Sequence, residues 1–275
     1  MMWQRIIWLF ILFILGKHLG FPDSPRYLEL ADSADYFISR ENWPRAEEKI
    51  LEALRLEPAN FSNSMLLSNL GMVQTRMGKY REALKSLSLG LNIAPSSCVL
   101  LNNRAHTFLL LDSVAPAVRD IDLSLKLDSV QEWPLQTRAF LYLYDNDTKS
   151  ASLMLHQLKS LFPHNQSATA GFGAIAEKEG RTKDALKFYE QALKERPDDD
   201  ETRESYILLL IRTDDYSGAR KVIREGIEIN EENPMFYLLR GYLHRLNHRL
   251  DEAKADKSIA IGKGLDPKVV TQFIP

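Results

Sequence analysis

The chain has 275 residues, of which 45% are hydrophobic and 26% are charged, and its formal net charge at pH 7 is −2. This composition is that of an ordinary globular protein with enough apolar residues for a continuous core. The small net charge argues against a nucleic-acid partner, because phosphate binding needs a basic surface, and the single cysteine, Cys98, excludes an intramolecular disulfide framework.

The N-terminal segment differs from everything that follows it. Residues 6–16 (IIWLFILFILG) form an uninterrupted apolar run after one positive charge, and Lys17 ends it. The run matches the core of a signal peptide but is shorter than the roughly 20 residues needed to span a bilayer. No small-residue cleavage site and no cysteine for lipid attachment follow it. We expect residues 1–20 to be a signal peptide or, as a close alternative, an uncleaved membrane anchor, with a buried terminal helix as a third interpretation.

Residues 21–26 are predicted to be a short linker, because Pro22 and Pro25 resist helix continuation. From residue 27 to residue 267 the chain repeats itself. One alanine recurs at intervals of 34 residues, after a first interval of 37, at Ala46, Ala83, Ala117, Ala151, Ala185, Ala219 and Ala253. Twelve residues before each of these comes a second small residue, with Ile207 as the exception, at Ala34, Gly71, Ala105, Ala139, Gly173 and Gly241.

Each period is predicted to hold two amphipathic helices that meet at a turn such as Gly78-Lys79-Tyr80. Helices of about 12 to 14 residues are marginal in isolation, so each must bury its apolar side against a neighbour, and stacked pairs form a solenoid. Lys257 stands in the last unit where an apolar residue is expected, which suits a terminal repeat whose outer side faces water. The C-terminal tail, residues 268–275, could dock on the last helix.

A helix pair of period 34, written with Leu-Gly, Gly-x-Tyr, two alanines and a closing proline, resembles the tetratricopeptide repeat. The resemblance covers about seven units over residues 27–267. It implies an all-α fold, a tetratricopeptide-type helix-hairpin solenoid wound as a right-handed superhelix. It also implies a non-enzymatic, protein-binding role, with the first helix of each pair lining the concave side.

When the family's concave positions are carried over, units two to four hold Met, Leu and aromatic side chains. The predicted partner-binding groove consists of Met72, Asn102, His106, Leu109, Leu110, Trp133, Gln136, Phe140, Leu143 and Tyr144. A monomer rarely leaves an apolar patch of this kind to water, so we expect it to bind an apolar or amphipathic segment of another protein. The polar members Asn102, His106 and Gln136 would align the segment's backbone. The alternative is that a tight superhelix, or the N-terminal segment, covers these side chains.

Binding of a peptide's terminal carboxylate is not expected. Family members that clamp a carboxylate resemble one another in placing lysines and an arginine along this side, with asparagines between them. Asn69 and Asn103 keep one asparagine position, but Ser68, Asn102 and Gln136 stand where a lysine is expected.

No pattern predicts catalysis, a metal or a cofactor. His244 and His248 are four residues apart and could share a helix face, a spacing that suits a metal, but no third ligand is in view. The acidic run 198–201 precedes a predicted helix, where carboxylates complement the helix dipole. We therefore expect no catalytic residue and no cofactor.

The function predicted from the sequence is an exported or membrane-anchored interaction scaffold with another protein or peptide as partner. The membrane would also be a partner if the N-terminal segment stays uncleaved. An alternative is an extracytoplasmic assembly factor that transiently binds an apolar or lipid-bearing client, and a metal-dependent role for His244 and His248 is the third hypothesis. The partner's identity and the oligomeric state stay open.

Overall fold

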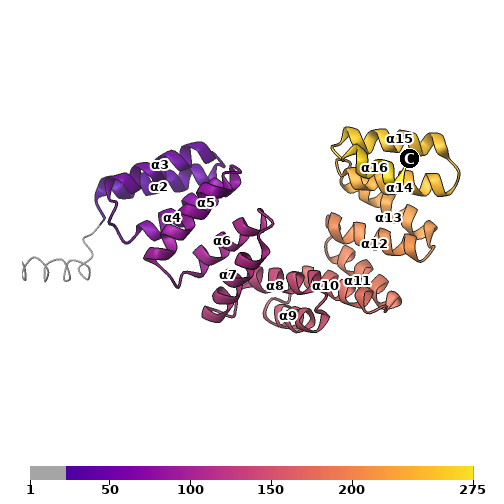
Figure 1. Cartoon of the computed structure of the whole chain (residues 1–275), viewed down its shortest axis with the longest axis horizontal. Helices are drawn as coiled ribbons and strands as arrows, with labels where there is room; N and C mark the ends of the chain where they lie inside the picture. Colours follow the sequence, from indigo (N-terminus) through magenta and orange to yellow (C-terminus); the bar gives the residue numbers. More distant parts are fainter. Residues whose placement is uncertain (1–22, 275) are drawn as a thin grey trace, which may run out of the picture. The chain divides into compact units, whose positions relative to one another are not determined.

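The structure is a computed structural model that describes residues 23–274, so the predicted signal or anchor segment lies outside the described residues. Between residues 23 and 274 the chain forms fifteen helices, α2 to α16, and no strand (Figure 1). None of these helices has the length and hydropathy of a membrane span.

The chain divides into two compact units, which are described separately. Unit 1 ends at Pro134 and unit 2 begins at Leu135. Unit 1 contains α2 (Pro25–Ser39), α3 (Trp43–Leu56), α4 (Asn63–Arg76), α5 (Tyr80–Ile93), α6 (Cys98–Leu109) and α7 (Val114–Leu127). Helix α8 (Glu132–Tyr144) begins in unit 1 and continues in unit 2. Unit 2 then contains α9 (Thr148–Leu161), α10 (Ser167–Lys178), α11 (Thr182–Glu195), α12 (Asp200–Arg212), α13 (Tyr216–Ile229), α14 (Pro234–Leu246), α15 (Leu250–Gly262) and α16 (Pro267–Phe273).

Each predicted period folds into a helical hairpin. In unit 1, α2 packs on α3, α4 on α5 and α6 on α7, and in unit 2, α10 packs on α11, α12 on α13 and α14 on α15 (Figure 1). The second helix of a hairpin also packs on the first helix of the next one, as α3 does on α4 and α11 on α12. Within each unit a hairpin therefore contacts mainly its neighbours, which is the arrangement of a solenoid.

The rows of small residues lie in the core, as the sequence predicts. All seven alanines of the first row are at most 1% exposed. At Gly71 an added Cβ would lie 2.3 Å from Leu87 Cγ, so glycine permits the close approach of α4 and α5. Ile207, the exception in the second row, is also fully buried, in an apolar cluster formed by α12, α13 and α14.

The turn inside each hairpin contains one residue in the left-handed region. These residues, with their φ angles, are Glu41 (55°), Gly78 (73°), Asp112 (52°), Asn146 (61°), Gly180 (74°), Asp214 (60°) and His248 (59°). Asp and Asn tolerate this conformation better than other L-residues because their side chains can hydrogen-bond locally. Only two of the seven are glycine, the residue type that signals this conformation most clearly in a sequence.

Both ends of the described chain differ from the prediction in detail. Helix α2 begins at Pro25, inside the predicted linker, because proline is acceptable at the first helical position and the Ser24 side chain accepts a hydrogen bond from the Tyr27 amide. The C-terminal tail forms α16, which packs on α14 and α15. Its residues Val270 and Ile274 are at most 2% exposed, so the docking suggested by the sequence is present.

Candidate functional site

In unit 1, apolar and aromatic side chains gather on the first helices of consecutive hairpins. Three of them occupy the same register position at intervals of 34 residues: Met65 on α4, Val99 on α6 and Trp133 in the first turn of α8. Met65 is 74% exposed and Val99 is 62% exposed. We name the set Met65, Met72, Val99, His106, Leu110 and Trp133 the α4–α6 face.

Polar side chains join the first helices that carry this face. Asn103 Nδ2 donates to Ser68 Oγ at 3.1 Å, and the buried hydroxyls of Thr75 and Thr107 lie 2.9 Å apart, so α4 and α6 are linked at two levels. Asn69 Nδ2 donates to Asp35 Oδ1 on α2 at 3.1 Å. The two asparagines that match the family's carboxylate-binding pattern therefore make hydrogen bonds between successive repeats.

His106 and Trp133 form an aromatic pair on the α4–α6 face. Their ring centroids are 6.0 Å apart and the rings meet edge to face at 82°. His106 keeps an exposed edge, but partial desolvation by its neighbours, and secondarily the positive charge of Arg76, lower its pKa below the ordinary value of 6.5. The imidazole is therefore neutral at pH 7 and adds to the apolar character of the face.

The remaining predicted groove residues of unit 1 are partly used by the fold. Asn102 Nδ2 donates to Gln131 Oε1 at 2.8 Å, while the buried Asn102 Oδ1 has no hydrogen-bond partner within the described chain. Met72 packs partly against the core formed by α2, α3 and α4. Leu109 is half-buried, whereas Leu110 is 45% exposed.

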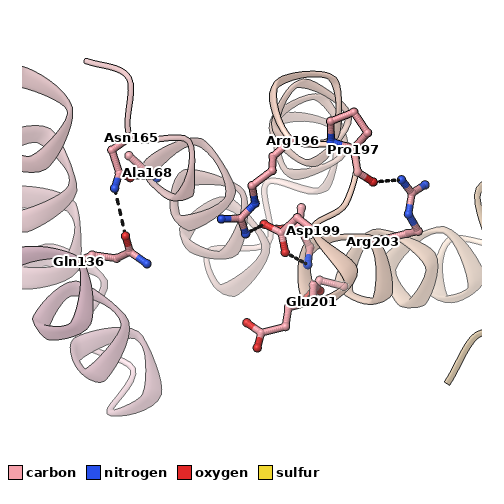
Figure 2. Close-up of polar contacts among 10 residues, drawn as sticks. Gln136, Asn165, Ala168, Arg196, Pro197, Asp199, Glu201 and Arg203 are labelled. Carbon is pink, nitrogen blue, oxygen red and sulfur yellow. Dashed lines mark hydrogen bonds and ion pairs between the residues drawn. The ribbon is translucent and has the colours of Figure 1, made fainter. Parts of the chain in front are cut away.

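The other predicted groove residues lie on the part of α8 that belongs to unit 2. Tyr144 is 78% exposed and Phe140 is 37% exposed, so both are available to a partner. Gln136 Oε1 accepts a hydrogen bond of 3.0 Å from Asn165 Nδ2 (Figure 2). Leu143 is only 4% exposed, so its side chain lies in the core and is not part of a surface groove.

The two histidines considered as metal ligands do not share a helix face. Helix α14 ends at Leu246, and His248 occupies the left-handed turn position that follows it. His244 Nε2 lies 3.8 Å from Asp256 Oδ2. Across residues 23–274 no three His, Cys, Asp or Glu side chains gather in a metal-binding group.

The acidic run before α12 caps that helix, as its position in the sequence suggests. Asp199 accepts a hydrogen bond from the Thr202 amide at 3.1 Å and pairs with Arg196 (Figure 2). The Asp199 carboxylate thus caps the N-terminus of α12.

Sequence analysis missed a cavity of about 570 Å³ in unit 2, between α11 and α13 with α12 at its base. Arg203 lines it and is only 3% exposed. The repeat register contained a signal for this site, because Arg203 stands four residues before the second small-residue row, where unit 1 has the buried leucines Leu30, Leu67 and Leu101.

Comparison with known proteins agrees with the repeat architecture. The tetratricopeptide repeat family matches residues 176–243. A tetratricopeptide repeat protein from Parabacteroides merdae ATCC 43184 is similar in structure, with a TM-score of 0.79 and 24% identity over 91% of this chain and 98% of that one.

Two further solved structures share the fold at lower identity. A chain of the APC/C hetero-tetramer Cut9–Hcn1 has a TM-score of 0.66 and 12% identity, covering 89% of this chain and 54% of that one. PilW, a widely conserved type IV pilus biogenesis factor, has a TM-score of 0.63 and 16% identity, covering 71% of this chain and 90% of that one. No curated protein sequence is significantly similar to the chain.

The molecule is therefore an all-α solenoid of the tetratricopeptide type, and the predicted fold class is confirmed. The family match in unit 2 and the similar structures support the resemblance that the repeat pattern suggested.

Proposed function

We propose that the chain is a non-enzymatic protein–protein interaction scaffold, exported or membrane-anchored, whose α4–α6 face binds an apolar segment of a partner protein. The general class rests on the fold, since tetratricopeptide-type solenoids bind other proteins or peptides. The observation that carries the site is the exposure of Met65 (74%) and Val99 (62%) in one register row with Trp133.

The composition of the face indicates what kind of segment it binds. Methionine and aromatic side chains are enriched at partner-binding surfaces, because they are large and methionine adapts to different shapes. The neutral His106 adds no charge, and Arg76 is the cation beside it. An apolar segment fits these properties. If the segment carries a charge, a negative charge near Arg76 fits best.

Unit 2 supplies a second pair of candidate anchors, Phe140 and Tyr144, on α8. Aromatic side chains in such positions contribute strongly to binding when a partner buries them. We propose that they take part in capturing the same class of partner.

The exposed apolar side chains also favour one alternative. An extracytoplasmic assembly factor that transiently binds an apolar or lipid-bearing client would need the same surface. The two functions differ in the molecule that is retained, which is a defined protein for the scaffold and a lipid or lipidated chain for the assembly factor.

Capture from native membranes with the full-length chain tests the proposal. The variants are Met65→Ala/Val99→Ala and Phe140→Ala/Tyr144→Ala. The matched control is Leu89→Ala/Leu153→Ala, which removes side chains that are 55% and 70% exposed on second helices instead. A photo-crosslinker at position 99 identifies what touches the face.

The scaffold hypothesis requires one protein that crosslinks at position 99 and is lost with the face variants but not with the control. Equal capture by all variants would overturn the site. A crosslinked lipid, with no protein, would favour the assembly factor.

The location is tested separately. Protease treatment of intact and permeabilised cells shows on which side of the membrane the repeats lie, and N-terminal sequencing of the mature chain distinguishes a cleaved signal from an anchor. Digestion of the repeats only after the cytoplasm has been opened would contradict export.

A further inference from the structure

The cavity in unit 2 is elongated along α13. Its lining residues there run from Asp215, the N-cap of α13, to Ile229 at the end of the helix, over a length of about 21 Å at 1.5 Å per residue. Helix α12 supplies the base, with Leu210 toward one end and Arg203 toward the other, and α11 supplies the opposite wall. An extended peptide of about six residues has this length.

Arg203 is a departure from the repeat pattern. At the equivalent position units one to four have Leu30, Leu67, Leu101 and Leu135, which are between 1% and 7% exposed, as expected for the core of a hairpin stack. Units five and seven have the buried Thr169 and Tyr237 there, so Arg203 is the one charged residue of the row. Arg203 is equally buried, at 3%. A buried guanidinium is costly unless charge and hydrogen bonds compensate it.

That compensation is incomplete. Arg203 Nη2 donates to the Pro197 carbonyl oxygen at 2.6 Å (Figure 2), but Nε has no hydrogen-bond partner in the described chain. The closest ion pair joins Nη1 to Glu225 Oε2 at 3.9 Å, which is too long for a hydrogen bond. The guanidinium thus retains unused donor capacity at one end of the cavity: Nε is buried without a partner, and Nη1 makes only the long ion pair with Glu225.

The rest of the lining suits a peptide. Leu193, Tyr206, Leu210 and Val222 provide apolar surface between the helices. Lys194 and Lys221 lie on the two walls, where they pair with Glu190 at 2.8 Å and with Glu225 at 4.0 Å. Apolar lining with charged groups of both signs can accept alternating apolar and polar side chains of an extended segment.

We infer that the groove between α11 and α13 is a second binding site, which receives an extended peptide segment of a partner and places a carboxylate of that segment on Arg203. Its apolar residues contact Leu193, Leu210 and Val222. The site lies on other helices than the α4–α6 face, and either can exist without the other.

Glu225 competes with the ligand in this arrangement. Its side chain is 44% exposed and its two ion pairs are long, so it can move aside when a carboxylate arrives. Removing its charge should therefore strengthen peptide binding, an effect that a purely structural role for Arg203 does not predict.

The test selects binders to the full-length chain from a randomised hexapeptide library, presented with free and with amidated C-termini. We expect enrichment of peptides that carry aspartate, glutamate or a free chain end next to leucine or phenylalanine. The amidated arm shows whether the carboxylate belongs to a side chain or to the chain end. Affinities of the best peptide are then measured by fluorescence anisotropy.

Arg203→Leu introduces the residue that units one to four have at this position. It should fold, but should weaken binding about tenfold or more, because a charge-assisted hydrogen bond is lost. Glu225→Gln should tighten binding severalfold, while Lys194→Gln, a change at a side chain that is 72% exposed, should alter it little. Arg203→Lys, which keeps the charge but loses the planar fork, replaces Arg203→Leu if that variant is unfolded by circular dichroism. Absence of carboxylate enrichment, or equal affinity of the folded Arg203 variant, would overturn the inference.

Discussion

The left-handed residue in each hairpin turn allows a direct test of how backbone conformation limits stability. Glu41 occupies this position with φ of 55° and an exposed side chain that makes no hydrogen bond or ion pair within the described residues. An L-residue pays about 1–2 kcal/mol in this region. Glycine avoids that cost but loses about 0.5–1 kcal/mol more conformational entropy on folding. Glu41→Gly should therefore stabilise the first hairpin by about 0.5–1 kcal/mol.

The reverse change isolates the same quantity. Around Gly180, with φ of 74°, an added Cβ would meet no atom within 4 Å, so Gly180→Ala changes only the backbone energy. It should destabilise unit 2 by about 0.5–1 kcal/mol. Glu48→Gly is the control, because it replaces the same residue type at an exposed site inside α3. It should cost about 1 kcal/mol of helix propensity and also removes the exposed ion pair of Glu48 with Arg45 at 3.0 Å.

The assay must resolve individual hairpins, since repeat arrays can unfold in parts. Native-state hydrogen exchange of the α2 and α3 amides reports the local opening free energy of the first hairpin. Urea unfolding followed by circular dichroism gives the global value. Slower exchange for Glu41→Gly and faster exchange for Glu48→Gly are expected. If both variants exchange faster, the conformational argument is wrong.

Three further predictions concern the core and the buried charges. Ala151→Leu should overpack a crossing where Ala151 is fully buried and cost about 1–3 kcal/mol, and an unchanged melting temperature would show that this crossing is loose. Arg104→Met should lower the free energy of unfolding, measured with urea, by roughly 3 kcal/mol. It leaves Asp120, which is 6% exposed, without its two hydrogen bonds of 2.7 and 2.8 Å. The double change Arg104→Met/Asp120→Leu should recover most of the lost free energy. Burial raises the pKa of Glu47, but hydrogen bonds and the charge of Lys79 outweigh burial and hold the pKa below 4.5. The ionised Glu47 therefore stabilises the fold above pH 4.5, and this contribution is lost as the pH falls through the lowered pKa. Glu47→Gln should flatten the pH dependence of urea unfolding below pH 4.5, and an unchanged slope would contradict this.

The period of the sequence predicted the hairpins because small residues at crossings are required wherever two helices approach closely. Ala83 and Ala117 are fully buried for that reason. Residue type signals the turn position at Gly78 and Gly180 and, less strongly, at Asp112, Asn146 and Asp214. Glu41 and His248 adopt the same conformation without such a signal. Residue identity shows backbone conformation reliably only when the residue is glycine or proline.

The exposure of the predicted groove residues was only partly predictable. The register placed Trp133, Phe140 and Tyr144 on first helices, and Phe140 and Tyr144 are exposed there. The same register placed Leu143 on the surface, yet it is buried, because whether a side chain at the edge of a helix face reaches water depends on the helices packed beside it. Arg203 was not predicted as a site residue because arginine side chains normally lie on the surface.

Helix α16 has a consequence for assembly. Inside unit 2, the α12–α13 hairpin presents a side that α14 covers, and the α14–α15 hairpin has a corresponding side on which α16 lies. A Cβ added at Gly241 would lie only 2.5 Å from Ile274 Cδ1, so glycine permits the close packing of Ile274 on α14. Arg245 Nη1 also donates a hydrogen bond of 2.6 Å to the Phe273 carbonyl oxygen. Head-to-tail contacts between identical chains produce open filaments when the joining surfaces are free. Because α16 packs on this side, the surface that the α14–α15 hairpin would otherwise present to a further hairpin is covered within the chain itself.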